Sequence, residues 1–181
     1  MAGTRSSKQT VRNMLQSLAV IGIAAAVIYV FIPHDESDAP PLKAVNYTVE
    51  LTTVRRAAPY PVAAPVGLPD QDKWKATSVS YDGTKDNAWH LGFLDPHNQY
   101  VAVEQSTAPS EKFVAEVSRN AAKTEKSQQI GGATWTFWDG PKYDALVRQD
   151  KGSTTVVTGT APYGQLVAMA GALESKRTPA A

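Results

Sequence analysis

The sequence of 181 residues contains no cysteine and three histidines. The absence of cysteine excludes disulfide bonds, thiolate zinc sites, thiol nucleophiles and lipid attachment through a cysteine. The formal net charge is +1, and acidic and basic residues are mixed along the chain. A basic surface for nucleic acid or for an acidic substrate is therefore not indicated, and we expect no nucleic-acid partner. The length is enough for one domain with its own core, besides an anchor and two tails.

A long uncharged segment near the N-terminus is the strongest single feature of the sequence. Residues 14–32 read MLQSLAVIGIAAAVIYVFI, and about 19 helical residues just cross a hydrocarbon core of ~30 Å. Arg5, Lys8 and Arg12 precede the segment, and acidic residues follow it. The positive-inside rule then places the N-terminus in the cytoplasm and the rest of the chain outside it. We predict a single-pass protein of the cell membrane.

The alternative to an anchor is a cleaved secretory signal. Such a signal has a similar basic start, but its apolar run is shorter and ends at small residues. Here the three alanines at 24–26 are followed by further apolar residues, and Pro33 leads into acidic residues. A retained transmembrane helix is the interpretation that we prefer.

The composition divides the chain into five parts. These are a basic cytoplasmic tail at 1–13, the transmembrane helix at 14–32, a stalk at 33–43, an extracytoplasmic domain at 44–176 and a disordered tail at 177–181. At the start of the domain, apolar residues alternate with polar ones from Asn46 to Thr53, which predicts a half-buried strand. Four prolines between Ala57 and Pro69 then predict an extended loop pinned across the domain.

A pattern of three strands followed by one helix then occurs twice. The first copy has strands at 77–82, 88–94 and 100–105, and the second has strands at 134–138, 143–149 and 154–159. The letters Thr-Ala-Pro precede both predicted helices, which begin after Pro109 and Pro162 and carry one apolar stripe each. We therefore expect an α+β fold with two βββα-like repeats, in which a mainly antiparallel sheet has both helices packed on one face.

The histidines and serines form no recognised catalytic or metal-binding pattern. The spacing of the three histidines matches no metal site, and we expect no metal and no cofactor. His90 alternates with Trp89 and Leu91, so it is expected on the more polar face of the sheet, solvated or hydrogen-bonded. The chain lacks the G-x-S-x-G elbow of many serine hydrolases.

Six residues are candidates for contact with a ligand or partner: Arg55, Arg56, Tyr60, Trp138, Lys142 and Tyr143. The two arginines, beside a segment rich in proline, are either an anion clamp or a solvated pair. The segment 139–144 is either a tight hairpin or a recognition loop. Because Trp135 and Trp138 are an odd number of residues apart, they face opposite sides of a strand, and we expect one of them to be exposed.

Seven stretches of the sequence resemble a known family. They are 10–12 with 17–20, 32–34, 55–62, 89–93, 103–107 and 140–146. Together they are similar to an uncharacterised family of actinobacterial single-pass membrane proteins, the domain of unknown function 4245, over most of the chain. The resemblance implies a membrane anchor and an envelope location. The family offers no established activity, cofactor or catalytic residue to transfer.

Three functions remain open on these observations. The leading hypothesis is a non-enzymatic binding or interaction module, which presents a sheet face or the loop at 55–65 to an envelope protein or a cell-wall component. The second is a carrier for a lipid or small hydrophobic ligand, held in a cavity between helices and sheet. The third is an envelope hydrolase or transferase that uses carboxylates near Glu104 and Asp144.

Overall fold

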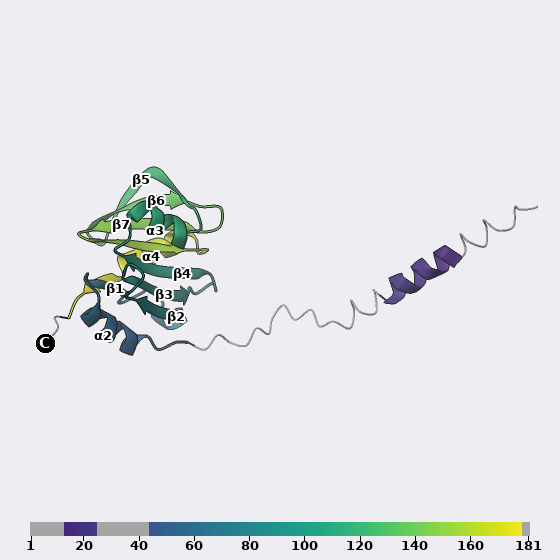
Figure 1. The fold of residues 1–181 in the computed structure, drawn as a ribbon, viewed down its shortest axis with the longest axis horizontal. Coiled ribbons are helices and arrows are strands. Elements are labelled where there is room, and N and C mark those ends of the chain that lie inside the picture. The colour runs from purple at the N-terminus through teal and green to yellow at the C-terminus, as the bar shows by residue number, and fades with distance from the viewer. Residues whose placement is uncertain (1–12, 25–43, 179–181) are drawn as a thin grey trace, which may run out of the picture. The chain divides into compact units, whose positions relative to one another are not determined.

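The computed structural model describes residues 13–24 and 44–178 (Figure 1). Residues 13–24 form a helix whose apolar side chains, among them Leu15, Leu18 and Ile21, are about two thirds exposed. Within the described residues, no helix is both long and apolar enough to cross a membrane. The second half of the predicted transmembrane segment, the predicted stalk and most of the N-terminal tail lie outside the described residues.

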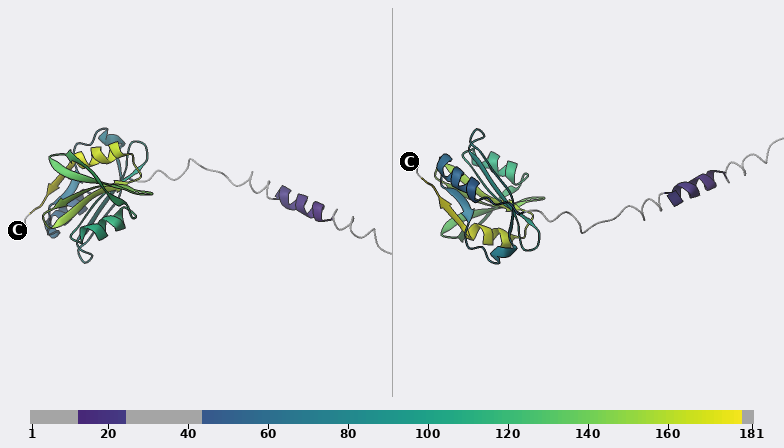
Figure 2. Two further views of the ribbon diagram at one scale, coloured as in Figure 1. Left: turned by 90° about the horizontal axis from the view of Figure 1, so that it is seen from above. Right: turned by 90° about the horizontal axis from the view of Figure 1, so that it is seen from below.

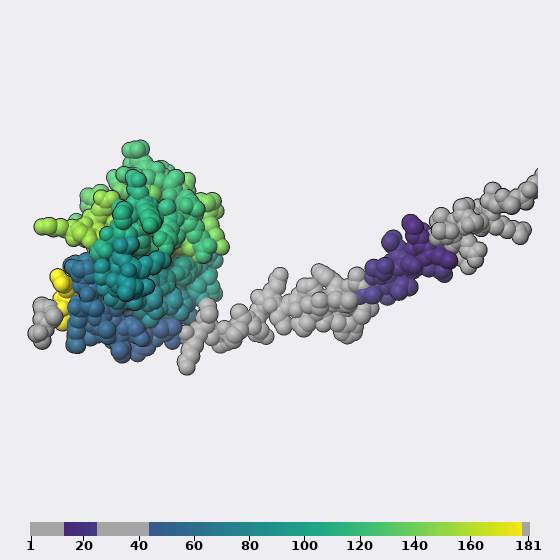
Figure 3. Space-filling view, in the orientation of Figure 1, coloured from purple at the N-terminus to yellow at the C-terminus, as the bar shows by residue number. Residues whose placement is uncertain are grey.

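The folded domain is built on a seven-stranded antiparallel sheet. In chain order its strands are β2 (Lys75–Asp82), β3 (Ala88–Leu94), β4 (Tyr100–Ser106), β5 (Ala122–Ile130), β6 (Ala133–Asp139), β7 (Asp144–Asp150) and β8 (Ser153–Gly159). Across the sheet they run in the order β2-β3-β4-β8-β7-β6-β5. The space-filling view agrees with this order (Figure 3). The early segments of the domain are blue and the later ones are green, and the two lie at opposite ends. The predicted α+β class and antiparallel sheet are confirmed.

The remaining elements are three helices, one short 3-10 helix and a second, two-stranded sheet. They are α2 (Thr48–Ala57), α3 (Ser110–Val117), α4 (Tyr163–Gly171), η1 (Gln71–Lys73), β1 (Val62–Pro65) and β9 (Leu173–Lys176), with β1 antiparallel to β9. The predicted order of three strands and a helix occurs twice, as β2-β3-β4-α3 and β6-β7-β8-α4. Strand β5 lies between the two copies and, like β9, was not predicted.

The predicted strand at 46–53 is wrong, because most of this segment belongs to α2. Leu51 and Val54, three residues apart, face the core, whereas Val49 is 71% exposed. The hydroxyls of Thr52 and Thr53 donate to the carbonyls four residues earlier, at 2.9 and 3.0 Å, so the polar side chains are satisfied within the helix. Packing of one apolar stripe overrides the strand preference of a sequence rich in threonine and valine.

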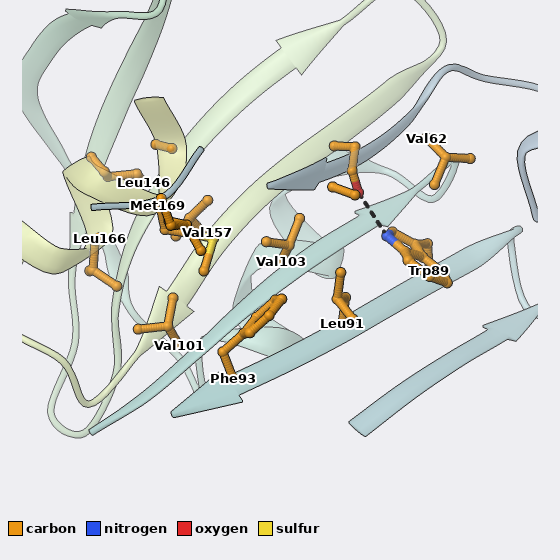
Figure 4. Close-up of a cluster of buried hydrophobic side chains, with 14 of the residues drawn as sticks. Val62, Trp89, Leu91, Phe93, Val101, Val103, Leu146, Val157, Leu166 and Met169 are labelled. Atoms are coloured by element: carbon orange, nitrogen blue, oxygen red, sulfur yellow. Dashed lines mark hydrogen bonds between the residues drawn. The ribbon is translucent and has the colours of Figure 1, made fainter. Parts of the chain in front are cut away.

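Strand β1, within the segment predicted as a loop, is held to the main sheet by buried side chains. The Ala63 N–H donates to Gln105 Oε1 at 2.7 Å. Trp89 Nε1 donates to the Ala63 carbonyl at 3.1 Å, which is the dashed line at Trp89 in Figure 4. Gln105 Nε2 donates in turn to Thr155 Oγ1 at 3.0 Å. The N–H and C=O of one strand residue point the same way. Both of these groups of Ala63 point away from β9, and the side chains of Gln105 and Trp89 are their hydrogen-bond partners.

Helices α3 and α4 lie on opposite faces of the sheet, so their predicted placement on one face is wrong (Figure 2). Val114 of α3 belongs to a buried cluster with Val156 of the central strand β8. Leu166 of α4 belongs to the other buried cluster, which includes Val157, the next residue of β8. Neighbouring strand residues point to opposite faces, which separates the two helices.

The register between β4 and β8 explains this arrangement. Glu104 and Val157 hold the same position in their repeats, counted back from the helix that follows each strand. In the sheet, however, Val157 pairs with Val103, and Glu104 pairs with Val156. Since side chains alternate with a period of two, equivalent positions of the two repeats face opposite sides.

Both tryptophans of β6 are buried, one on each face of the sheet. Trp135 is fully buried in the cluster that includes α4, and Trp138 is 8% exposed in the cluster beneath α3. They do face opposite sides, as predicted. The expectation that one of them is exposed is wrong, because helices cover both faces at this point.

Candidate functional site

One half of the α3 side of the sheet carries polar side chains instead of a helix. Helix α3 packs over β7 and β8. On the same side, β2, β3 and β4 present Ser78, Ser80, His90, Tyr100 and Glu104, which we call the open face. His90 is hydrogen-bonded there, as its alternation with buried neighbours predicted.

Three side chains of the open face form a continuous hydrogen-bonded line across three strands. Ser78 Oγ lies 2.7 Å from His90 Nε2, and His90 Nδ1 lies 2.6 Å from Glu104 Oε1. The side chains of His90 and Glu104 are 27% and 13% exposed, so solvent reaches the line only in part. Each distance is within the range of a direct proton transfer between donor and acceptor.

The regular pairing of β2 with β3 places Ser78 on this side of the sheet. Ser78 pairs with Gly92 and Ser80 with His90, so the two serines, separated by one neighbour, share the open face. A β-bulge lies on the other side of Ser78. Ala76 pairs with Phe93 and points into the core, because the extra residue, Thr77, reverses the face of Ala76.

Burial and pairing act in opposite directions on the two titratable groups of this line. The hydrogen bond to Glu104, together with its negative charge, raises the pKa of His90, although burial alone would lower it. Burial raises the pKa of Glu104, and the hydrogen bond to His90 lowers it in part. The carboxylate 2.6 Å from Nδ1 favours a proton on that nitrogen. With its proton on Nδ1, the neutral ring accepts a hydrogen bond from Ser78 at Nε2.

Gly92 leaves room for two hydroxyl groups at the centre of the open face. A Cβ atom at this position would clash with Ser78 Oγ and would lie 3.2 Å from the hydroxyl oxygen of Tyr100. The two hydroxyl groups therefore lie close together above the α-carbon of Gly92. Burial raises the pKa of Tyr100 to about 12, so this side chain stays a neutral hydrogen-bond donor at neutral pH.

A pocket of about 440 Å³ adjoins this line, between the sheet and the C-terminal end of α3. Its lining consists of Tyr100, Glu104, Glu116, Val117, Arg119, Tyr143 and Thr158. The rings of Tyr100 and Tyr143 lie 5.9 Å apart, and the Arg119 guanidinium lies 5.3 Å from the centre of the Tyr143 ring. Aromatic faces, hydroxyls and one guanidinium therefore converge on one hollow, as in pockets for small ligands.

Arg119 holds its place at the rim of the pocket against backbone preference. It follows α3 with φ 57°, and Asn120 follows with φ 69°. The N–H of Asn120 donates to the Ala115 carbonyl at 2.8 Å and closes the helix, in a motif whose left-handed residue is usually glycine. A left-handed arginine costs on the order of 1 kcal/mol, and such residues gather at ligand sites. None of the ion pairs in the described parts of the chain includes Arg119.

One of the six contact residues predicted from the sequence lines this pocket. It is Tyr143, and the Lys142 ammonium lies 5.8 Å from the centre of its ring. Arg55 and Arg56 lie instead in the last turn of α2. The sequence thus singled out the 139–144 hairpin, which borders the pocket through Tyr143, but it did not separate this surface from that of α2.

The other two predicted contact residues are buried, and the sequence missed the residues that matter most to the site. Tyr60 is 2% exposed in the core, and Trp138 lies beneath α3. Ser78 was missed because its contact with His90 depends on the register between β2 and β3, which the sequence does not show. Arg119 was missed because only its backbone conformation distinguishes it from other surface cations.

The carboxylates of Glu104 and Asp144, predicted to act together, lie apart, and the acid that shares the pocket with Glu104 is Glu116. Glu104 pairs with Val156 and faces the open side, while Asp144 pairs with Gly159 and faces the other. Asp144 Oδ1 accepts from the Gly140 N–H at 3.1 Å and shapes the hairpin. Within the described parts of the chain, no three or more histidine, aspartate or glutamate side chains gather as metal ligands would.

A family comparison agrees with the resemblance seen in the sequence. The family described as Protein of unknown function (DUF4245) matches residues 7–173. The chain belongs to this family. No curated protein matches the chain. The predicted family is thus confirmed over nearly the whole chain, and any function has to be argued from the pocket and the line of side chains beside it.

Proposed function

We propose that the domain is a binding module that takes an anionic, hydroxyl-bearing group, such as an acidic sugar or a lipid headgroup, into the pocket beside α3. The observation that carries the proposal is Arg119, which is held in a costly left-handed conformation and rests on Tyr143. A glycine would close α3 with less strain. An arginine here is best explained by what its guanidinium binds.

The charges around the pocket favour an anion at Arg119. The carboxylate of Glu104 is hydrogen-bonded to His90, and the Glu116 carboxylate lies 3.0 Å from the Lys85 ammonium. Arg119 is therefore left to engage a carboxylate or phosphate oxygen of a ligand, for which its planar fork is well suited. The faces and hydroxyls of the two tyrosines suit a ring that carries hydroxyl groups.

We place this module outside the cytoplasm, tethered to the cell membrane by residues 14–32. The support is the uncharged run itself and the change from basic to acidic residues across it. An anchored pocket of this kind would meet both cell-wall glycans and lipid headgroups. The shared chemistry of the two ligand sources is an anionic group beside hydroxyls.

Binding of the full-length chain, in mild detergent, to two probes tests the proposal. One probe is soluble peptidoglycan fragments, and the other is vesicles that contain phosphatidylinositol. We expect saturable binding to one of them, which weakens at high salt because an ion pair with Arg119 contributes. Binding to the fragments alone identifies a glycan ligand, and binding to the vesicles alone identifies a headgroup.

Two arginine variants separate the pocket from the surface of α2. Arg119→Gly removes the guanidinium and relieves the left-handed strain, so it should weaken binding about tenfold or more while stability stays equal or rises. Arg56→Ala removes an exposed cation of α2 and serves as the matched control. Loss of binding in Arg56→Ala, with none in Arg119→Gly, would move the site to α2.

A smaller apolar hollow supports the carrier alternative less well. It has a volume of about 230 Å³ and is lined in part by Tyr47, Leu68, Trp74 and Phe93. Ligand pockets for drug-sized molecules usually have volumes of roughly 300–1,000 Å³. The pocket beside α3 is larger and more polar, and we therefore prefer it.

A further inference from the structure

We propose that Ser78 is an activated nucleophile that accepts an acyl group from an ester, with His90 as the general base and Glu104 as the residue that orients His90. This activity goes beyond binding and is independent of the anionic ligand. It assigns one chemical role to each member of the hydrogen-bonded line on the open face.

The arrangement matches the requirements of an activated serine. A nucleophilic hydroxyl needs a base within about 2.6–3.2 Å, and the base needs a third group that fixes its tautomer. Ser78 Oγ lies 2.7 Å from Nε2, and Glu104 holds Nδ1 at 2.6 Å. Such triads occur on unrelated folds and are recognised by geometry and roles, so the absence of a glycine-flanked elbow in the sequence does not argue against one.

The surroundings of Ser78 supply a donor for the reacting carbonyl. Because Gly92 has no side chain, Ser78 Oγ and the Tyr100 hydroxyl both lie close to its α-carbon. A carbonyl oxygen that becomes negative while Ser78 attacks can accept a hydrogen bond from Tyr100. This donor stays protonated because burial raises the pKa of Tyr100 to about 12.

The reaction balances with an ester and water as the two reactants. As the Oγ–carbon bond forms, the hydroxyl proton passes to His90 Nε2 and the carbonyl electron pair moves to oxygen. The tetrahedral intermediate then expels the alcohol, which takes the proton from Nε2. Water attacks the acyl-serine in the same way, transfers a proton through His90 back to Oγ, and releases the carboxylic acid.

Ser80 shows that the contact between Ser78 and His90 is specific. Ser80 is the direct strand partner of His90, lies on the same face and is exposed. The hydrogen bond of His90 Nε2 nevertheless goes to Ser78, which lies on the same face two residues earlier, opposite Gly92. Ser80 therefore serves as an internal control for the reactivity of Ser78.

Labelling of the full-length chain with a fluorophosphonate probe tests the proposal without knowledge of the substrate. An activated serine oxygen attacks the phosphorus, and fluoride leaves. Trypsin releases one peptide after Lys75 that holds both Ser78 and Ser80, and fragmentation assigns the modified residue. We expect one adduct, on Ser78, that forms faster as the pH rises through the pKa of His90.

Variants separate activation from a merely structural role. Ser78→Ala should abolish the adduct and Ser80→Ala should keep it, while His90→Gln should slow it about 10²- to 10⁴-fold. Glu104→Gln should slow it and move its pH profile to lower pH. Circular dichroism spectra and melting curves of each variant serve to check that the fold is retained. The proposal is overturned if the folded chain forms no adduct on Ser78 at pH 8, or if His90→Gln labels as fast as the unaltered chain.

Discussion

Replacing Trp89 by phenylalanine tests how β1 is held to the main sheet. Trp89 is fully buried, and its Nε1 donates to the Ala63 carbonyl at 3.1 Å. Phenylalanine keeps an aromatic ring at this place but removes the donor. The Ala63 carbonyl, which is itself fully buried and faces away from β9, then loses the donor that satisfies it.

The matched variant is Trp135→Phe. Trp135 is also fully buried, but its Nε1 has no hydrogen-bond partner in the described structure. Both variants remove the same atoms from the core. Only Trp89→Phe leaves a buried carbonyl unsatisfied, at a cost of about 1–3 kcal/mol. We therefore expect Trp89→Phe to lower the free energy of unfolding by about 1–3 kcal/mol more than Trp135→Phe does.

The difference is measured by urea unfolding of both full-length variants, followed by far-ultraviolet circular dichroism, since the substitutions alter tryptophan fluorescence. Equal slopes of the free energy against urea would show that the same surface unfolds in each. If Trp135→Phe destabilised the domain as much as Trp89→Phe, the hydrogen bond to Ala63 would not be what secures β1, and the reasoning would fail.

Two further predictions concern the open face and the central strand pair. The Glu104→Gln variant removes the charge that raises the pKa of His90 and leaves its burial. His90 should therefore titrate below pH 6.5, whereas in the unaltered chain it titrates above this value. Proton NMR of the imidazole ring measures the pKa in both proteins, and an unchanged pKa would contradict the pairing. In Gly159→Ala, the new Cβ would clash with the Tyr100 carbonyl oxygen and lie 2.8 Å from its carbonyl carbon. The pairing of β4 with β8 must then shift, and we expect a loss of more than about 2 kcal/mol in thermal or urea unfolding. Gly164→Ala, at a position with no atom near the added Cβ, is the control and should be close to neutral.

Local patterns in the sequence were sufficient to predict the strands and helices of the two repeats. Strand β3 begins and ends where alternation predicted, and both helices start directly after Pro109 and Pro162. These predictions succeed because alternation, turn residues and helix starts are properties of a few neighbouring residues. The missed strand β5 shows the limit: its side chains are almost all polar and exposed, so it lacks the apolar alternation that marks a strand.

Two features of the candidate site depend on how distant segments meet. The polar position of His90 followed from its buried neighbours, and Tyr143 was singled out from the hairpin around it. Ser78 joins His90 only through the register of β2 against β3, and Arg119 is distinguished only by its left-handed backbone. Neither property has a signal in the order of the residues.

The sequence by itself determined the family, the α+β class and the repeated order of three strands and a helix, because each rests on local patterns or on direct similarity. The tertiary structure decided which face each helix covers, and with it where the polar side chains are left open. The physical reason is the pairing of β4 with β8: a shift of one residue in this register exchanges the two faces. That register is set by contacts between strands about fifty residues apart, which no local pattern contains.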